Sequence, residues 1–198
     1  MPKKRNQDLH GSAPDKCDTA LLLIDVINAF QFPEAPQTLE FALPMARRLR
    51  TLKKSLGAAG VPSIYINDNF GRWQSNFSAI VETCAKSPGK EIVRLLRPKR
   101  HDYFVLKPMH SAFYSTTLDV LLRHLGAQRL IITGITTDIC VLFTANDAYM
   151  RDFEILVPQD CVCSHTTRQN DHALRHMQKV LKADIRPSAE LKLLHRRR

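Results

Sequence analysis

Short apolar runs alternate along the chain with longer stretches in which apolar residues recur every three or four positions. The runs predict buried β-strands at 19–24, 62–67, 103–106, 130–133 and 153–158, with a short sixth strand at 183–185. The three-to-four spacing predicts helices at 38–59, 77–84, 116–125, 137–150 and 167–181. Pro44 should end the first of these helices after one turn or kink it. Alternating strands and helices predict an α/β fold, a doubly wound three-layer (α/β/α) sandwich around a mostly parallel six-stranded sheet.

One domain accounts for this pattern. We expect it to span residues 18–186, with a disordered basic arm at 1–17 and a basic C-terminal tail at 187–198. No apolar run reaches the roughly 20 residues that a membrane span needs, and no apolar segment follows the basic N-terminus as in a secretory signal. The five cysteines are scattered and form no disulfide framework. These features favour a reducing, cytoplasmic setting and no membrane partner.

The formal net charge of +10 raises the possibility of nucleic-acid binding. However, much of the excess lies in runs at 3–5, 97–100 and 196–198, and no aromatic residues interleave these runs. No zinc-finger pattern is present either. Solvated basic ends therefore explain the charge, and we expect no specific nucleic-acid partner.

Cys140 follows the predicted strand at 130–133, a glycine turn and the first residues of a predicted helix. Unpaired N–H groups and the positive end of a helix dipole favour a thiolate at such a place. The alternative is an inert, buried cysteine, because cysteine is among the residue types most often buried. The local sequence leaves both interpretations open.

Asp25 and Lys107 also follow predicted strands at their carboxyl ends. In a parallel sheet these ends share one edge, so both residues can meet Cys140 there. Asp25 could instead cap a turn, and Lys107 could be a surface residue. Together, however, the three supply a nucleophile, a carboxylate base and an ammonium group that stabilises anions, and the lysine and the helix end should lower the thiol pKa. This combination predicts a catalytic site.

Two histidines and a cysteine pair offer weaker alternatives. His110 could serve as an alternative base near Lys107, and His165 could bind a metal. A histidine without a spaced partner is more often a surface or core residue. Cys161 and Cys163 are expected to pack in an apolar segment.

Three segments carry a resemblance to a known family: LLLIDVINAF at 21–30, Lys107-Pro108 followed by Ser-Ala-Phe at 111–113, and GITTDICV at 134–141. In this order and spacing they resemble the isochorismatase-like cysteine hydrolase superfamily, which includes nicotinamidases and N-carbamoylsarcosine amidases. The resemblance covers roughly residues 18–186 and is greatest to an uncharacterised branch of the superfamily.

The resemblance implies that Asp25, Lys107 and Cys140 form a catalytic triad. It also implies a cis peptide bond between Ile135 and Thr136, and an oxyanion hole made by the backbone N–H groups of Thr136 and Cys140. In the implied mechanism, Asp25 takes the thiol proton, the thiolate attacks a carbonyl, and water hydrolyses the resulting thioester.

The loop after the second predicted strand bears on the substrate. Nicotinamidases of this superfamily carry a metal-binding D-x-H motif there, whereas this chain has Asp68-Asn69-Phe70. We therefore expect no metal, no cofactor and no nicotinamide substrate. Aromatic and polar residues near the strand ends are candidates for lining the substrate pocket, although packing is an equal alternative for each: Phe30, Asn69, Trp73, Phe113 and Tyr114.

The leading hypothesis is a cofactor-free cysteine hydrolase that cleaves an amide or carbamoyl C–N bond of a small molecule. One alternative is isochorismatase-type vinyl-ether hydrolysis, for which the cysteine is not always needed. Others are a non-catalytic basic interaction protein on the same scaffold and a redox-sensing thiol. The resemblance also implies a homo-oligomer, a dimer or a tetramer.

Overall fold

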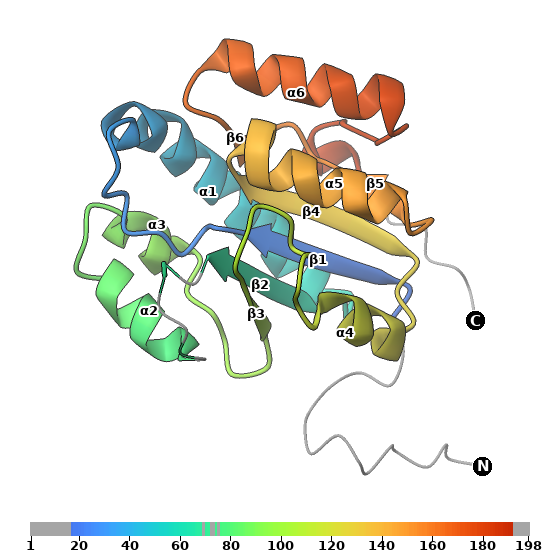
Figure 1. Cartoon of the computed structure of the whole chain (residues 1–198), viewed down its shortest axis with the longest axis horizontal. Helices are drawn as coiled ribbons and strands as arrows, with labels where there is room; N and C mark the ends of the chain where they lie inside the picture. Colours follow the sequence, from blue (N-terminus) through green and yellow to red (C-terminus); the bar gives the residue numbers. More distant parts are fainter. Residues whose placement is uncertain (1–16, 69, 72–73, 75, 192–198) are drawn as a thin grey trace.

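A computed structural model of the chain describes residues 17–68, 70–71, 74 and 76–191. Its centre is a six-stranded sheet in which every strand pair is parallel. Five strands follow the order β3-β2-β1-β4-β5, and β6 pairs with the carboxyl end of β4 (Figure 1). The strands are β1 (Thr19–Ile24), β2 (Ser63–Asp68), β3 (Tyr103–Lys107), β4 (Arg129–Ile135), β5 (Glu154–Leu156) and β6 (Val162–Cys163).

Helices cover both faces of the sheet, because the buried strands are apolar on both sides. In β1, Leu21 and Leu23 pack with the residues of α1, α2 and α3, whereas Leu22 and Ile24 pack with those of α4, α5 and α6. The helices are α1 (Ala35–Ala58), α2 (Phe77–Cys84), α3 (Lys90–Leu95), α4 (Leu118–Leu125), α5 (Leu142–Tyr149) and α6 (Thr167–Val180). The predicted three-layer α/β/α sandwich is confirmed.

Several predicted elements differ from the observed ones. Helix α1 runs continuously through Pro44, because buried residues before and after the proline hold the helix against the sheet. The prediction that the proline ends a first turn was wrong, and the alternative, a kink, stays a prediction. The predicted strand at 183–185 is a single bridge between Leu156 and Asp184. The sixth strand is β6, which is only two residues long. The predicted helix at 137–150 begins as a π-helical turn, η1 (Thr137–Val141), before α5.

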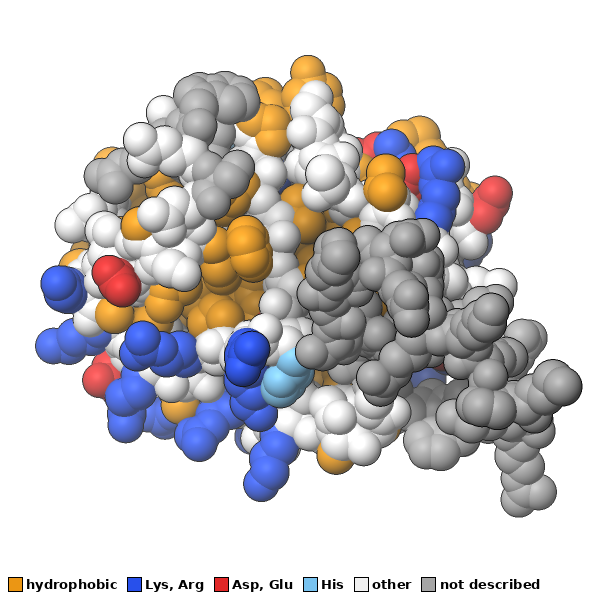
Figure 2. Space-filling model, turned by 90° about the horizontal axis from the view of Figure 1, so that it is seen from below, with side chains coloured by type: hydrophobic (Ala, Val, Ile, Leu, Met, Phe, Trp, Pro, Cys, Tyr) orange, Lys and Arg blue, Asp and Glu red, His pale blue; other side chains and the backbone are white. Residues whose placement is uncertain are grey.

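The ends of the chain are only partly described. The predicted basic arm lies outside the described residues except for Cys17, and the tail is described only to Leu191. That portion of the tail contains a 3₁₀ turn, η2 (Ser188–Glu190), where Ser188 bonds the Asp160 carboxylate. Figure 2 shows Lys and Arg side chains gathered along one side of the face it presents. Among the helices of the described residues, none is both long and apolar enough to cross a membrane.

Gly134 lets β4 approach β1 closely at the edge where the strands end. Its φ is +116°, and a Cβ atom at this position would lie 2.0 Å from the carbonyl oxygen of Ile24. Only glycine fits this backbone conformation and this distance. The approach sets the spacing between the strands that lead to Asp25 and to Cys140.

Replacing Gly134 with alanine should therefore lower the free energy of unfolding by more than about 3 kcal/mol, as measured by urea denaturation. Gly57→Ala is the matched control, because a Cβ at Gly57 meets nothing within 4 Å and the residue lies in α1. That control should leave stability unchanged or raise it by up to about 1 kcal/mol. Equal changes in the free energy of unfolding for the two substitutions would contradict a special requirement for glycine at position 134.

Candidate active site

Asp25 follows β1 directly and is held by three neighbours. Its backbone N–H donates to the carbonyl oxygen of Ile66 at 2.8 Å. One carboxylate oxygen, Oδ1, accepts from the backbone N–H of Asp68 at 2.8 Å, and the other, Oδ2, lies 2.9 Å from Lys107 Nζ. Both carboxylate oxygens are thus occupied in a residue that is only 7% exposed.

Lys107 is the last residue of β3 and is almost completely buried, with 1% of its surface exposed. Besides its ion pair with Asp25, its ammonium group donates to Cys140 Sγ at 3.5 Å. β2 lies between β1 and β3, so the lysine and the aspartate reach each other across the end of β2. The structure brings together the three residues that the sequence placed at strand ends.

Cys140 is half-buried in η1, and hydrogen bonds fix this turn from two directions. On the α6 side, Thr137 Oγ1 donates to Asn170 Oδ1 at 2.6 Å, and Ser164 Oγ donates to Asp138 Oδ1 at 2.6 Å. On the α5 side, Thr144 Oγ1 donates to the Cys140 carbonyl oxygen at 2.7 Å. The Ile135–Thr136 peptide bond is cis.

The isochorismatase domain model matches residues 19–186, which is most of the chain. The chain belongs to the isochorismatase family. The protein named "Uncharacterized isochorismatase family protein YaaI" of Bacillus subtilis (strain 168) is 42% identical over 170 residues, or 86% of this chain and 94% of that protein. The resemblance predicted from the motifs is therefore confirmed.

Relatives with named activities are more distant. Ureidoacrylate amidohydrolase RutB of Acinetobacter baylyi is 28% identical over 168 residues, covering 71% of this chain and 68% of RutB. The crystal structure of N-carbamoylsarcosine amidase from Thermoplasma acidophilum matches with a TM-score of 0.67 and 26% identity, covering 89% of this chain and 99% of that one. The chain is a hydrolase of the isochorismatase family.

Burial has a large effect on the pKa values of the three side chains at this site. Burial raises the pKa of the Cys140 thiol to about 12, with a further contribution from the Asp25 carboxylate, and Lys107 opposes this only in part. The expectation of a lowered thiol pKa was wrong, because it did not include desolvation. Burial also raises the pKa of Asp25, against the effect of Lys107. Burial lowers the pKa of the Lys107 ammonium, but Asp25 and Cys140 raise it by more, so the pKa is raised overall.

The predicted pocket residues lie in different surroundings. Phe30 is 2% exposed and packs 5.9 Å from Phe32, and Phe113 is 5% exposed and packs 6.1 Å from Phe153, measured between ring centroids. Tyr114 is 57% exposed. Asn69 and Trp73 lie outside the described residues. For all five, contact with substrate stays a prediction.

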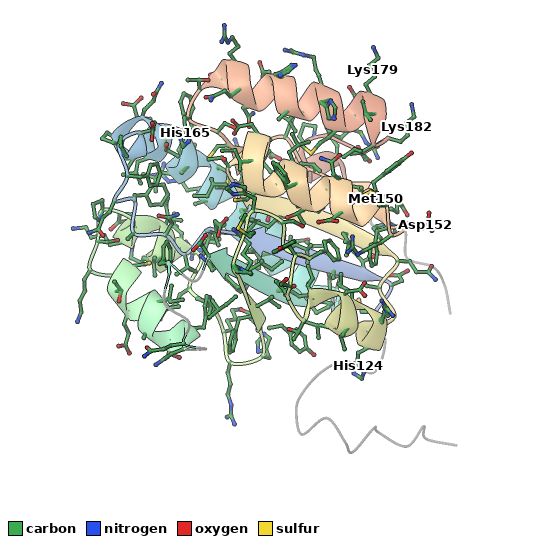
Figure 3. The ribbon with its side chains drawn as sticks, in the orientation of Figure 1. His124, Met150, Asp152, His165, Lys179 and Lys182 are labelled. Atoms are coloured by element: carbon green, nitrogen blue, oxygen red, sulfur yellow. The ribbon has the colours of Figure 1, made fainter. Side chains whose placement is uncertain are left out.

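The remaining chemical candidates are held by ordinary contacts. His165 lies beside α1 (Figure 3), with Nδ1 2.7 Å from Thr38 Oγ1. Asp68 Oδ1 accepts from the backbone N–H of Phe70 at 2.6 Å. Cys161 and Cys163 are buried among apolar residues. Within the described ranges, no group of three or more His, Cys, Asp or Glu residues could hold a metal ion.

The sequence did not reveal the polar residues that position the site. The Asp68 N–H group, Thr144, Ser164 and Asn170 all hold Asp25 or the Cys140 turn in place. These residue types are common in loops and helix starts, so only their neighbours in space identify them. Of these residues, only Asp68 could have been identified from the sequence, because it follows directly after a predicted strand and so lies at the same edge of the sheet as Asp25.

The effects of burial, Asp25 and Lys107 on the thiol pKa predict how Cys140 reacts in the free protein. Because its pKa is raised, the thiol is protonated at neutral pH, and iodoacetamide should alkylate Cys140 slowly, with a rate that rises as the pH rises. Asp25→Asn removes a charge that raises the thiol pKa and should speed alkylation, whereas Lys107→Ala should slow it. Mass spectrometry of the Cys140 peptide measures the rate, and Cys17 in the same samples is the control. Fast alkylation of Cys140 with a plateau below pH 8 would contradict a raised thiol pKa.

Proposed function

We propose that this hydrolase cleaves a C–N bond, an amide or carbamoyl linkage of a small molecule, through a thioester on Cys140. The observation that carries the proposal is the position of the Lys107 ammonium, 2.9 Å from Asp25 Oδ2 and 3.5 Å from Cys140 Sγ. The cation thereby contacts both the base and the nucleophile in a buried part of the protein. The names of two relatives, an amidohydrolase and an amidase, support the same bond type.

Acylation begins with a proton transfer. The Cys140 thiol gives its proton to the Asp25 carboxylate, whose raised pKa makes it a better proton acceptor than an ordinary carboxylate. The thiolate, beside the Lys107 ammonium, attacks the substrate carbonyl carbon. By the family resemblance, the backbone N–H groups of Thr136 and Cys140 stabilise the resulting oxyanion. The C–N bond then breaks, the nitrogen takes the proton from Asp25, and an S–acyl bond remains.

Deacylation returns the enzyme to its starting state. Water attacks the thioester carbonyl, the C–S bond breaks, and the sulfur regains a proton. The overall reaction consumes one water molecule and releases an amine and an acid. No electron transfer is involved.

The intact thiol favours this reaction over isochorismatase-type vinyl-ether hydrolysis. Protonation of the vinyl ether and addition of water do not need a sulfur nucleophile. Here the thiol is held against an ammonium group that stabilises a thiolate. An amide or carbamoyl substrate makes use of all three side chains.

The proposal can be tested with a panel of small primary amides, N-carbamoyl amino acids and ureido acids. Released ammonia or amine is measured for each compound. With any substrate found, Cys140→Ala should lower kcat/KM by about 10⁴-fold or more, and Asp25→Asn by roughly 10²- to 10⁴-fold. Cys17→Ser is the matched control and should keep full activity. Thermal unfolding of each variant separates loss of catalysis from loss of folding. Turnover that survives in Cys140→Ala would overturn the cysteine mechanism.

A further inference from the structure

The Cys140 sulfur has different neighbours on its buried and its open side. On the buried side stand Lys107 and Asp25, which are 1% and 7% exposed. On the open side stands His110, an exposed residue whose ring nitrogen Nδ1 is 4.0 Å from Sγ. The imidazole therefore touches the reacting atom from the direction of solvent.

Packing holds the His110 ring in this position. It lies against Phe143, with ring centroids 5.6 Å apart and an interplanar angle of 47°. Phe143 belongs to α5, the helix that continues the Cys140 turn. The imidazole and the thiol thus rest on the same structural unit.

Hydrogen bonds also join the loop of His110 to that unit. Ser111 donates to the Asp147 carboxylate of α5. The backbone N–H of Ala112 donates to Thr144 Oγ1 at 3.0 Å, and the same hydroxyl donates to the Cys140 carbonyl oxygen. One threonine therefore links the loop that carries the histidine to the turn that carries the nucleophile.

The Asp25 carboxylate lies on the buried side of the sulfur, where its two oxygens accept hydrogen bonds from the Asp68 N–H and from Lys107. Water that attacks the thioester comes from solvent, where His110 lies. A neutral imidazole accepts a proton near neutral pH more readily than other side chains do.

We propose that His110 is a further catalytic residue, the base that activates water in deacylation. This inference rests on the proposed function, since it requires an acyl group on Cys140. Nδ1 takes a proton from water while the water oxygen bonds to the acyl carbon. The C–S bond then breaks, and Nδ1 gives the proton to the leaving sulfur. Protons and electrons balance within the site, and Asp25 serves acylation while His110 serves deacylation.

The test uses p-nitrophenyl acetate as the probe, because nitrophenolate leaves without needing a proton. In the full-length wild type, acetyl transfer to Cys140 should give a burst of nitrophenolate followed by steady turnover. In His110→Gln the burst should persist, while the steady rate falls by about 10²-fold. Acetyl-Cys140 should then accumulate and be detected by peptide mass spectrometry.

Hydroxylamine separates a catalytic role from a structural one. It attacks thioesters without a general base, so it should restore turnover in His110→Gln and yield acetohydroxamic acid. His101→Gln, at an exposed histidine before β3, is the matched control and should behave as wild type. Cys140→Ala gives the background rate.

The outcomes are distinguishable. If the burst and the steady rate of His110→Gln fall together, or if neither changes, His110 is not the deacylation base. If hydroxylamine fails to restore turnover while acetyl-Cys140 is present, the role is also overturned. If the wild type forms no acetyl-Cys140, the proposed function itself fails, and this inference fails with it.

Discussion

The buried ion pair between Lys107 and Asp25 is the interaction on which the site depends. An ammonium group that is 1% exposed stays charged only beside an anion, and here the anion comes from a strand that is not its neighbour. The two side chains meet across the end of β2, whose Asp68 N–H binds the second carboxylate oxygen. Removing one partner of such a pair leaves a buried charge and costs about 3–5 kcal/mol. The order of the strands is therefore a requirement of the proposed chemistry as well as of the fold.

In the proposed mechanism, the same ion pair explains how a thiol with a pKa of about 12 acts as a nucleophile. Creating a thiolate by releasing its proton to water at neutral pH costs about 1.4 kcal/mol for each pKa unit. Transfer to Asp25 avoids much of that cost, because it moves a negative charge from one neighbour of Lys107 to another. The buried site keeps the same number of charges before and after the transfer. In the proposed mechanism, the thiol therefore stays protonated until the substrate carbonyl group is in place.

The sequence predicted the features that depend on local pattern. Apolar runs that are followed by Asp25, by Lys107 and, after a turn, by Cys140 were sufficient to place these residues at one edge of a parallel sheet. Features that depend on packing were not predictable: the depth of burial that raises the thiol pKa, and the helix that tolerates Pro44. Strand β6 is two residues long and has no periodicity to detect, yet it pairs with Gly134 and Ile135 just before the Cys140 turn. The polar residues that hold the turn, such as Thr144, are recognised only through their partners in space.

The site has two halves that are built differently. Asp25 and Lys107 are fixed by strand ends and by sheet hydrogen bonds, and the proposed bond-breaking chemistry depends on this half. His110 and Phe143 are exposed and belong to a loop and a helix surface, where substitutions disturb the core least. In the proposed reaction, a thioester formed at the first half is hydrolysed from the second, because that half is exposed to solvent. Under this proposal, differences in the open half change the rate of deacylation and the acyl groups that are accepted, while the buried half and its nucleophile stay the same.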